Sequence, residues 1–266
     1  MNTAFIKKLI ALLFLGITFN CCAQSAFDPV YSPQRILSSS TNWRNYLTHL
    51  RLWKEFVGYD TNGKLLSKEV FLKKLTTKSY MPLWLKTKDT DNVRYQLYKI
   101  DTSARKIVKV TFEDQIADVY YQYKMEGNPY PSFRFVDAKR HVYTNTSTSG
   151  KIIVFNYFFR GCLACNIERP ALNKLAAQYK DRKDILFIAL DNDQEYNNKM
   201  FLAESSFLYN VVRVDNDFMT KILNVYKYPQ NVIVGRNGKI LKAFNNDPNG
   251  LSIALKYYAS KSPTSD

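Results

Sequence analysis

Residues 151–170 read KIIVFNYFFRGCLACNIERP, and this stretch decides the fold. Its first nine residues are almost all apolar, which is typical of a central strand covered on both faces. Cys162 and Cys165 follow where the apolar run gives way to a segment with helical spacing. The sequence therefore predicts a buried strand that leads directly into a helix, with the cysteine pair where the helix begins.

The cysteine pair has the spacing of a reactive dithiol. Residues three apart on the first turn of a helix lie near each other, and a disulfide needs Cα atoms about 4.4–6.8 Å apart, so the pair can open and close with little backbone movement. At a helix start, unpaired N–H groups and the helix dipole favour the thiolate over the thiol. We therefore predict that Cys162 attacks and Cys165 resolves, with Arg160 adding a positive charge that favours the Cys162 thiolate.

Two other interpretations of the cysteine pair, and one of a nearby acidic segment, stay open. A structural disulfide is one, because secreted proteins favour oxidised pairs, although so short a ring constrains the unfolded chain little. A zinc site would need two more ligands, and neither His49 nor His141 stands at finger-like spacing from another ligand. The run from Asp191 to Glu195 could hold a cation, but carboxylates at a strand end more often cap the next helix. We expect no metal and no cofactor.

The flanking segments alternate between strands and helices. Upstream, residues 133–136 are strand-like; downstream, the spacing predicts a helix to residue 179, a buried strand at 185–190, a helix at 195–207, a strand at 211–214, a helix at 218–226, a hairpin at 232–244 and a helix at 251–258. This pattern predicts an α/β fold in which helices cover a mixed sheet, with residues 127–260 as one domain.

Residues 41–126 predict a smaller α+β domain of unknown role. Apolar residues from Trp43 to Val57 recur at helical spacing, and Ser67 could cap a helix that ends at Leu75. Residues 93–100 and 105–112 alternate like the two strands of a hairpin, and another helix is expected before residue 127. Nothing in this part of the sequence looks catalytic.

Residues 1–23 have the features of a secretory signal peptide. Two lysines precede an apolar run at residues 9–19, and small or polar residues follow. The run covers 11 residues, whereas a membrane-spanning helix needs about 20. We expect cleavage after Ala23, with lipidation of Cys21 or Cys22 as the alternative. Residues 24–40 are interpreted as a linker and residues 261–266 as a disordered tail.

The chain is basic throughout. Its 38 basic and 23 acidic side chains give a formal net charge of +15, and the excess is spread evenly along the sequence. A nucleic-acid binder usually concentrates this charge in one stripe. The sequence therefore predicts no nucleic-acid partner, and at most a peripheral attraction to anionic membrane surfaces.

Residues 127–260 resemble the thioredoxin superfamily, specifically its TlpA/ResA-like extracytoplasmic branch. The similarity rests on motifs in the right order: the entry GNPYPSF at 127–133, Asn156 six residues before Cys162, the C-x-x-E-x-P helix start at 165–170, and Tyr228-Pro229 directly before the hairpin. The resemblance covers about half the chain. It implies a thioredoxin-like three-layer α/β/α sandwich with a mixed sheet, preceded by the smaller α+β domain.

The resemblance also implies roles outside the cysteine pair. Glu168 would handle the proton of the Cys165 thiol, although a surface carboxylate favoured by the helix dipole is the alternative. Pro229, in the cis form, would face the cysteines, and the backbone of Tyr228 would pair with a substrate segment. One departure is Gly161, which stands where the family usually carries tryptophan beside the first cysteine.

These features together predict an enzyme, an extracytoplasmic thiol-disulfide oxidoreductase that reduces protein disulfides. By family analogy it would act in the periplasm or cell envelope of a Gram-negative bacterium, with electrons from a membrane or periplasmic donor. Leu163-Ala164 replaces the usual proline-containing pair between the cysteines, so the direction of electron flow stays open. The alternative from another class is a redox-silent thioredoxin-fold scaffold whose N-terminal domain mediates interactions.

Overall fold

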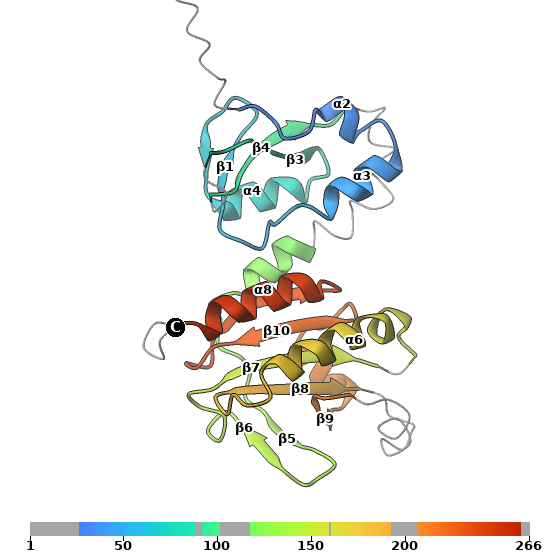
Figure 1. Cartoon of the computed structure of the whole chain (residues 1–266), viewed down its shortest axis with the longest axis vertical. Helices are drawn as coiled ribbons and strands as arrows, with labels where there is room; N and C mark the ends of the chain where they lie inside the picture. Colours follow the sequence, from blue (N-terminus) through green and yellow to red (C-terminus); the bar gives the residue numbers. More distant parts are fainter. Residues whose placement is uncertain (1–26, 89–91, 102–117, 160, 193–206, 262–266) are drawn as a thin grey trace, which may run out of the picture.

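The computed structural model of this chain describes residues 27–88, 92–101, 118–159, 161–192 and 207–261 (Figure 1). Several sequence predictions fall outside the described residues: the signal peptide with Cys21 and Cys22, the strand at 105–112, Arg160, the helix at 195–207 except its last residue, the acidic residues Asp193 and Glu195, and the tail beyond residue 261.

The C-terminal half is built on a five-stranded sheet with the order β11-β10-β7-β8-β9. Its central strand is β7 (Ile152–Phe158), in which every residue is buried. On one side β8 (Ile185–Asp191) and β9 (Asn210–Arg213) continue the sheet in parallel. On the other side β10 (Gln230–Val234) and β11 (Ile240–Asn245) run antiparallel to their neighbours. The predicted buried central strand, mixed sheet and closing hairpin are confirmed.

Side chains of β7 alternate between two cores, as the two-residue period of a strand requires. Ile152, Val154 and Phe158 pack on the face covered by α6 (Leu163–Gln178) and α8 (Pro248–Ala259). Ile153, Phe155 and Tyr157 belong to the opposite core. That core also holds residues from β5 (Arg134–Val136), β6 (Val142–Thr144) and the short π-helix η1 (Phe218–Ile222): Phe135, Tyr143 and Met219. Both faces of the sheet are therefore covered, as the thioredoxin-like prediction requires.

One predicted helix of this half is shorter than expected. The sequence predicts a helix at 218–226, whereas the helical turn η1 ends at Ile222. Asn224 takes a left-handed backbone conformation with φ of 52°. Such a residue commonly ends a helix, and asparagine tolerates it better than most side chains.

The front half forms a smaller α+β unit around a four-stranded sheet of order β2-β1-β4-β3. The strands are β1 (Val57–Tyr59), β2 (Leu65–Leu66), β3 (Tyr80–Trp84) and β4 (Arg94–Lys99), and β4 pairs with β1 in parallel and with β3 in antiparallel fashion. Three helices accompany them: α2 (Pro33–Ile36), α3 (Ser40–Leu47) and α4 (Lys68–Leu75). The predicted cap at Ser67 is confirmed, since its side chain accepts a hydrogen bond from the Val70 N–H.

Three sequence predictions in this unit are corrected. The helix expected from Trp43 to Val57 ends at Leu47. Leu50 and Phe56 reach the front core from outside a helix, whereas Trp53 packs against the core of the C-terminal half. The expected linker at 24–40 contains α2, which Ser32 caps and which buries Ile36. Strand β3 was not predicted; it contains Pro82, which is tolerated because β3 lies at the edge of its sheet.

A helix at residues 118–125 lies between the two units (Figure 1). It was predicted before residue 127, and its side chains Val119, Tyr120 and Tyr123 pack against the core of the front unit. Within the described part of the chain, none of the helices has both the length and the apolar character needed to cross a membrane.

Candidate active site

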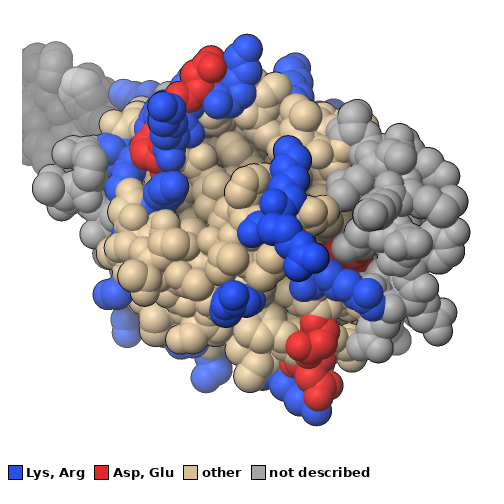
Figure 2. Space-filling view, turned by 90° about the horizontal axis from the view of Figure 1, so that it is seen from below, with Lys and Arg blue, Asp and Glu red and all other residues tan. Residues whose placement is uncertain are grey.

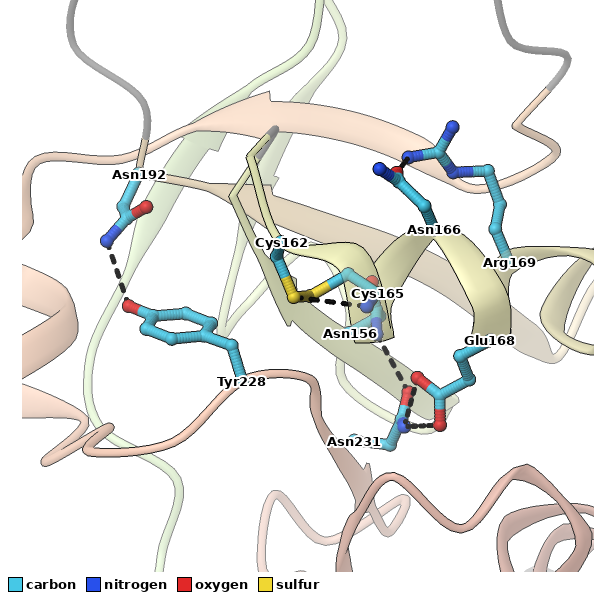
Figure 3. Close-up of a disulfide and its surroundings, with 9 residues drawn as sticks. All are labelled: Asn156, Cys162, Cys165, Asn166, Glu168, Arg169, Asn192, Tyr228 and Asn231. Carbon is cyan, nitrogen blue, oxygen red and sulfur yellow. Dashed lines mark hydrogen bonds between the residues drawn. A yellow bond between two sulfur atoms is a disulfide. The ribbon is translucent and has the colours of Figure 1, made fainter.

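Cys162 and Cys165 lie where β7 passes into α6, as predicted. Cys162 is the N-cap residue of α6, and the backbone N–H of Cys165 donates a hydrogen bond to its sulfur at 3.0 Å (Figure 3). The two residues form a disulfide with Cα atoms 5.2 Å apart. The pair therefore meets the distance requirement for opening and closing without a large change in the backbone.

Exposed apolar side chains lie near the cysteines in the sequence. Cys162 itself is 6% exposed, whereas Leu163 and Ile167 on the first turns of α6 are 73% and 70% exposed. Phe159, three residues before Cys162, is also exposed. These three exposed apolar side chains, which lie within five positions of Cys162 in the sequence, are called the apolar rim below: Phe159, Leu163 and Ile167.

Glu168 is buried, which removes the alternative that it is an ordinary surface carboxylate. It is 2% exposed, and its two carboxylate oxygens accept hydrogen bonds from the side-chain N–H₂ of Asn231 at 3.0 and 3.1 Å. The side-chain oxygen of Asn231 in turn accepts a hydrogen bond from Asn156 at 3.0 Å (Figure 3). Three elements, α6, β10 and β7, therefore meet through one chain of side-chain hydrogen bonds.

Burial raises the pKa of Glu168 to about 7, while the hydrogen bond from Asn231 acts in the opposite direction and the charge of Asp247 adds to the increase. A carboxyl group with a pKa near neutrality can both release and accept a proton under ordinary conditions. Glu168 lies on the same helix as Cys165, three residues further along.

Sequence reasoning did not single out Asn231. Asn156 and Asn231 are direct partners in the register of β7 and β10, so their contact depends on the pairing of strands far apart in the chain. The signal in the sequence is an asparagine in each of two largely apolar strands. A buried amide needs a hydrogen-bond partner, so two such residues could have suggested a polar contact.

The Tyr228–Pro229 peptide bond is cis. The ring of Tyr228 packs edge-on against Phe159, with centroids 5.3 Å apart, and its hydroxyl accepts a hydrogen bond from Asn192 at 2.9 Å. A Cβ placed on Gly161 would lie 3.6 Å from the Phe159 ring. Phe159 and Tyr228 therefore provide aromatic surface close to the position where the resembling proteins usually carry tryptophan.

Potential metal ligands are not gathered in the part of the chain that the structure describes. In those residues there is no group of three or more His, Cys, Asp or Glu side chains that could hold a metal ion. His141 instead pairs with Asp137, with Nδ1 and Oδ2 2.9 Å apart. Pro170, which the resemblance placed in the active-site helix, lies inside α6.

Comparison with known proteins gives one family match, to Redoxin, over residues 125–257. The thiol:disulfide interchange protein CycY of Rhizobium leguminosarum bv. viciae is 32% identical over 99 residues, which span 37% of this chain and 52% of that protein. The thiol-disulfide oxidoreductase ResA of Bacillus thuringiensis subsp. konkukian is 25% identical over 126 residues, which span 47% of this chain and 72% of that protein. The match therefore covers about half the length of the first relative.

Among solved structures, the thioredoxin domain of a thiol-disulfide oxidoreductase from Bacteroides vulgatus is similar to this chain, with a TM-score of 0.43 and 23% identity. The similarity covers 50% of this chain and 97% of that one. The Redoxin match begins at residue 125, after the front unit.

Proposed function

The chain belongs to the Redoxin family as a TlpA/ResA-like member of the thioredoxin superfamily, and from this membership we propose that it is a thiol-disulfide oxidoreductase that reduces protein disulfides through Cys162 and Cys165. The observation that carries the proposal is the position of Cys162 as the N-cap of α6, with its sulfur 3.0 Å from the Cys165 backbone nitrogen. Once the pair is reduced, the helix dipole and this N–H favour a thiolate at Cys162.

The reaction begins with the reduced pair, a thiolate at Cys162 and a thiol at Cys165. The thiolate attacks one sulfur of the substrate disulfide, so a mixed disulfide forms and the first substrate sulfur leaves as a thiolate. Glu168 accepts the proton of the Cys165 thiol. The Cys165 thiolate then attacks Cys162 Sγ, which restores the internal disulfide and releases the second substrate sulfur.

Electrons and protons balance over this cycle. The dithiol loses two electrons and the substrate disulfide gains them, so the protein ends oxidised and the substrate ends as two thiols. One product thiol takes the proton held by Glu168, and the other takes a proton from solvent that replaces the one Cys162 lost on forming its thiolate. Return to the dithiol needs a second dithiol as electron donor, which we place in the membrane or the periplasm.

Substrate contact is assigned to the apolar rim and to the Tyr228–Pro229 segment. Exposed apolar side chains around a reactive centre suit transient contact with a partly unfolded chain, in which cysteines and apolar residues are accessible. We further propose that the protein works in the periplasm or envelope of a Gram-negative bacterium, delivered by residues 1–23, with a lipid at Cys21 or Cys22 as the alternative to free release.

Two matched cysteine variants test the function. Cys165→Ser keeps the attacking sulfur and removes the resolving one, so it should accumulate a mixed disulfide with a disulfide-bonded substrate protein such as insulin. Cys162→Ser should form none, and the reduced wild-type protein should reduce insulin while both variants do not. A reduced wild-type protein that leaves insulin and small disulfides untouched would leave the redox-silent scaffold as the remaining assignment.

A further inference from the structure

A groove with a volume of about 700 Å³ lies between the front unit and the segment that carries the cis-proline. One wall comes from the end of α3 and the turn that follows it, residues 44–53. The other wall contains Tyr228 and Pro229, the end of β11 and the start of α8. The groove is therefore shared by the two units, and it adjoins the segment to which we assign substrate contact.

The helix at 118–125 fixes one wall against the other. Its residues Tyr120 and Tyr123 pack against the front core. On the opposite side the Tyr121 hydroxyl donates a hydrogen bond to the Asn224 carbonyl at 2.9 Å, and Asp118 pairs with Lys227 at 3.0 Å. The front unit is thus joined directly to the segment that leads into Pro229.

Contacts beside the groove strengthen this junction. The Trp53 ring meets Phe244 edge-on, with centroids 5.6 Å apart. Lys242 of β11 pairs with Glu126 at 2.6 Å and lies 3.9 Å from Glu55 of the front unit. Apolar packing and the largely buried ion pair between Lys242 and Glu126 therefore join the two walls of the groove.

Two residues that line the groove carry buried polar atoms without a hydrogen-bond partner among the described residues: Trp53 at Nε1, and Asn245 at both side-chain polar atoms. Such atoms are rare in folded proteins and call for an explanation. The amide of Asn245 offers one acceptor and a donor group, which is the set that a peptide group complements.

The side chains of the front wall indicate which polypeptides fit. This wall presents apolar surface from Leu47, Leu50 and Trp53, together with Arg44 and Arg51, and it presents no carboxylate to the groove. On the other wall Asp118 is paired with Lys227, and Asp247 caps α8 through the Gly250 N–H. The end of the molecule away from the front unit is also richer in basic than in acidic side chains (Figure 2).

We propose that this groove holds an extended segment of the protein substrate, rich in apolar and acidic side chains, that flanks the cysteine under attack. The front unit is then a part of the substrate-binding site, and residues 44–53 determine specificity. This inference rests on the proposed function, because it assigns a recognition surface to that same disulfide exchange.

The test uses the full chain and two short peptides, each closed by one disulfide: one carries leucine and glutamate beside the cysteine, and the other carries lysine in place of glutamate. Bis(2-hydroxyethyl) disulfide serves as a small substrate that does not need the groove. Arg44→Glu reverses the charge of an exposed front-wall residue, and Asn249→Trp fills the groove from the start of α8. Arg35→Glu is the matched control, since Arg35 is exposed on α2 and does not line the groove.

We expect Arg44→Glu to raise KM for the glutamate peptide about tenfold and to lower KM for the lysine peptide, because a like charge replaces an attractive one. Asn249→Trp should raise KM for both peptides. All variants should reduce the small disulfide at the wild-type rate, and Arg35→Glu should match the wild type throughout. If the peptide KM values of Arg44→Glu and Asn249→Trp stay at the wild-type level, the groove assignment is overturned and the proposed function stands. If the wild-type protein reduces neither the peptides nor the small disulfide, the proposed function is overturned, and the groove assignment falls with it.

Discussion

Replacing Glu168 with glutamine should remove a fall in stability that the oxidised protein shows as the pH rises through neutrality. Burial raises the pKa of Glu168 from 4.5 to about 7. The folded protein therefore holds this proton more tightly than the unfolded chain does. Stability from this proton is fully present below the unfolded pKa and is lost as the pH rises through the folded pKa.

The size of the effect follows from the shift. A difference of one pKa unit corresponds to about 1.36 kcal/mol, so the rise at Glu168 corresponds to about 3 kcal/mol, of which roughly 2–3 kcal/mol is lost between about pH 5 and about pH 8. Glu168→Gln keeps the shape of the side chain and an oxygen that can accept from Asn231, but it does not titrate. The variant should therefore keep the stability that the wild type loses across this range.

The assay is urea unfolding of the disulfide-intact proteins at about pH 5 and about pH 8. The quantity compared is the difference in the free energy of unfolding between wild type and variant, in which the contributions of other titrating groups cancel. Glu69→Gln is the control: Glu69 has a pKa lowered by its hydrogen bond from Lys124, so its contribution changes only at lower pH and should be constant over this range. If Glu168→Gln and the wild type lose stability in parallel, Glu168 does not titrate near neutrality and its assignment as the proton acceptor loses its physical basis.

Two further substitutions test contacts around the site and between the units. Asn231→Leu removes the hydrogen bond that lowers the pKa of Glu168, so the pH at which the rate of disulfide reduction is half-maximal should rise by about one unit or more. Asn192→Leu is the control: it removes the amide that donates to the Tyr228 hydroxyl and should leave this pH unchanged. Lys242→Met leaves the largely buried Glu126 without its partner and should lower the free energy of unfolding by about 3 kcal/mol in urea titrations. Lys221→Met, at an exposed pair with Asp217, should change it by less than about 1 kcal/mol.

Local patterns were enough to place the strand β7, the helix α6 and the cysteine pair between them. An unbroken apolar run followed by helical spacing has few alternative explanations, and the spacing of the cysteines fixes their distance once the helix exists. In the front unit the same kind of reasoning failed between Trp43 and Val57. Apolar residues at helical spacing can also reach a core from a non-helical segment. Leu50 and Phe56 do so, since they pack against the front core although the helix ends at Leu47.

The part of the site that the sequence could not predict depends on strand register. The C-x-x-E-x-P motif indicates Glu168, but the partner of its carboxylate follows from the pairing of Asn156 with Asn231 across β7 and β10. These two asparagines are 75 positions apart in the chain. A shift of one residue would turn Asn231 to the opposite face of the sheet. The groove depends in the same way on contacts between units that no local pattern reports.

In the role that we propose for Glu168, the hydrogen bond from Asn231 would allow its carboxyl group to serve the exchange in either direction. A fully buried carboxyl without a donor would stay protonated at neutral pH and could not accept the proton of Cys165, while a solvated one would stay ionised and could not return it. Burial raises the pKa of Glu168 and the Asn231 amide lowers it, with a result of about 7. Because both protonation states are then populated, the direction of electron flow is set by the reduction potentials of the partners and of the cysteine pair, and not by the proton acceptor.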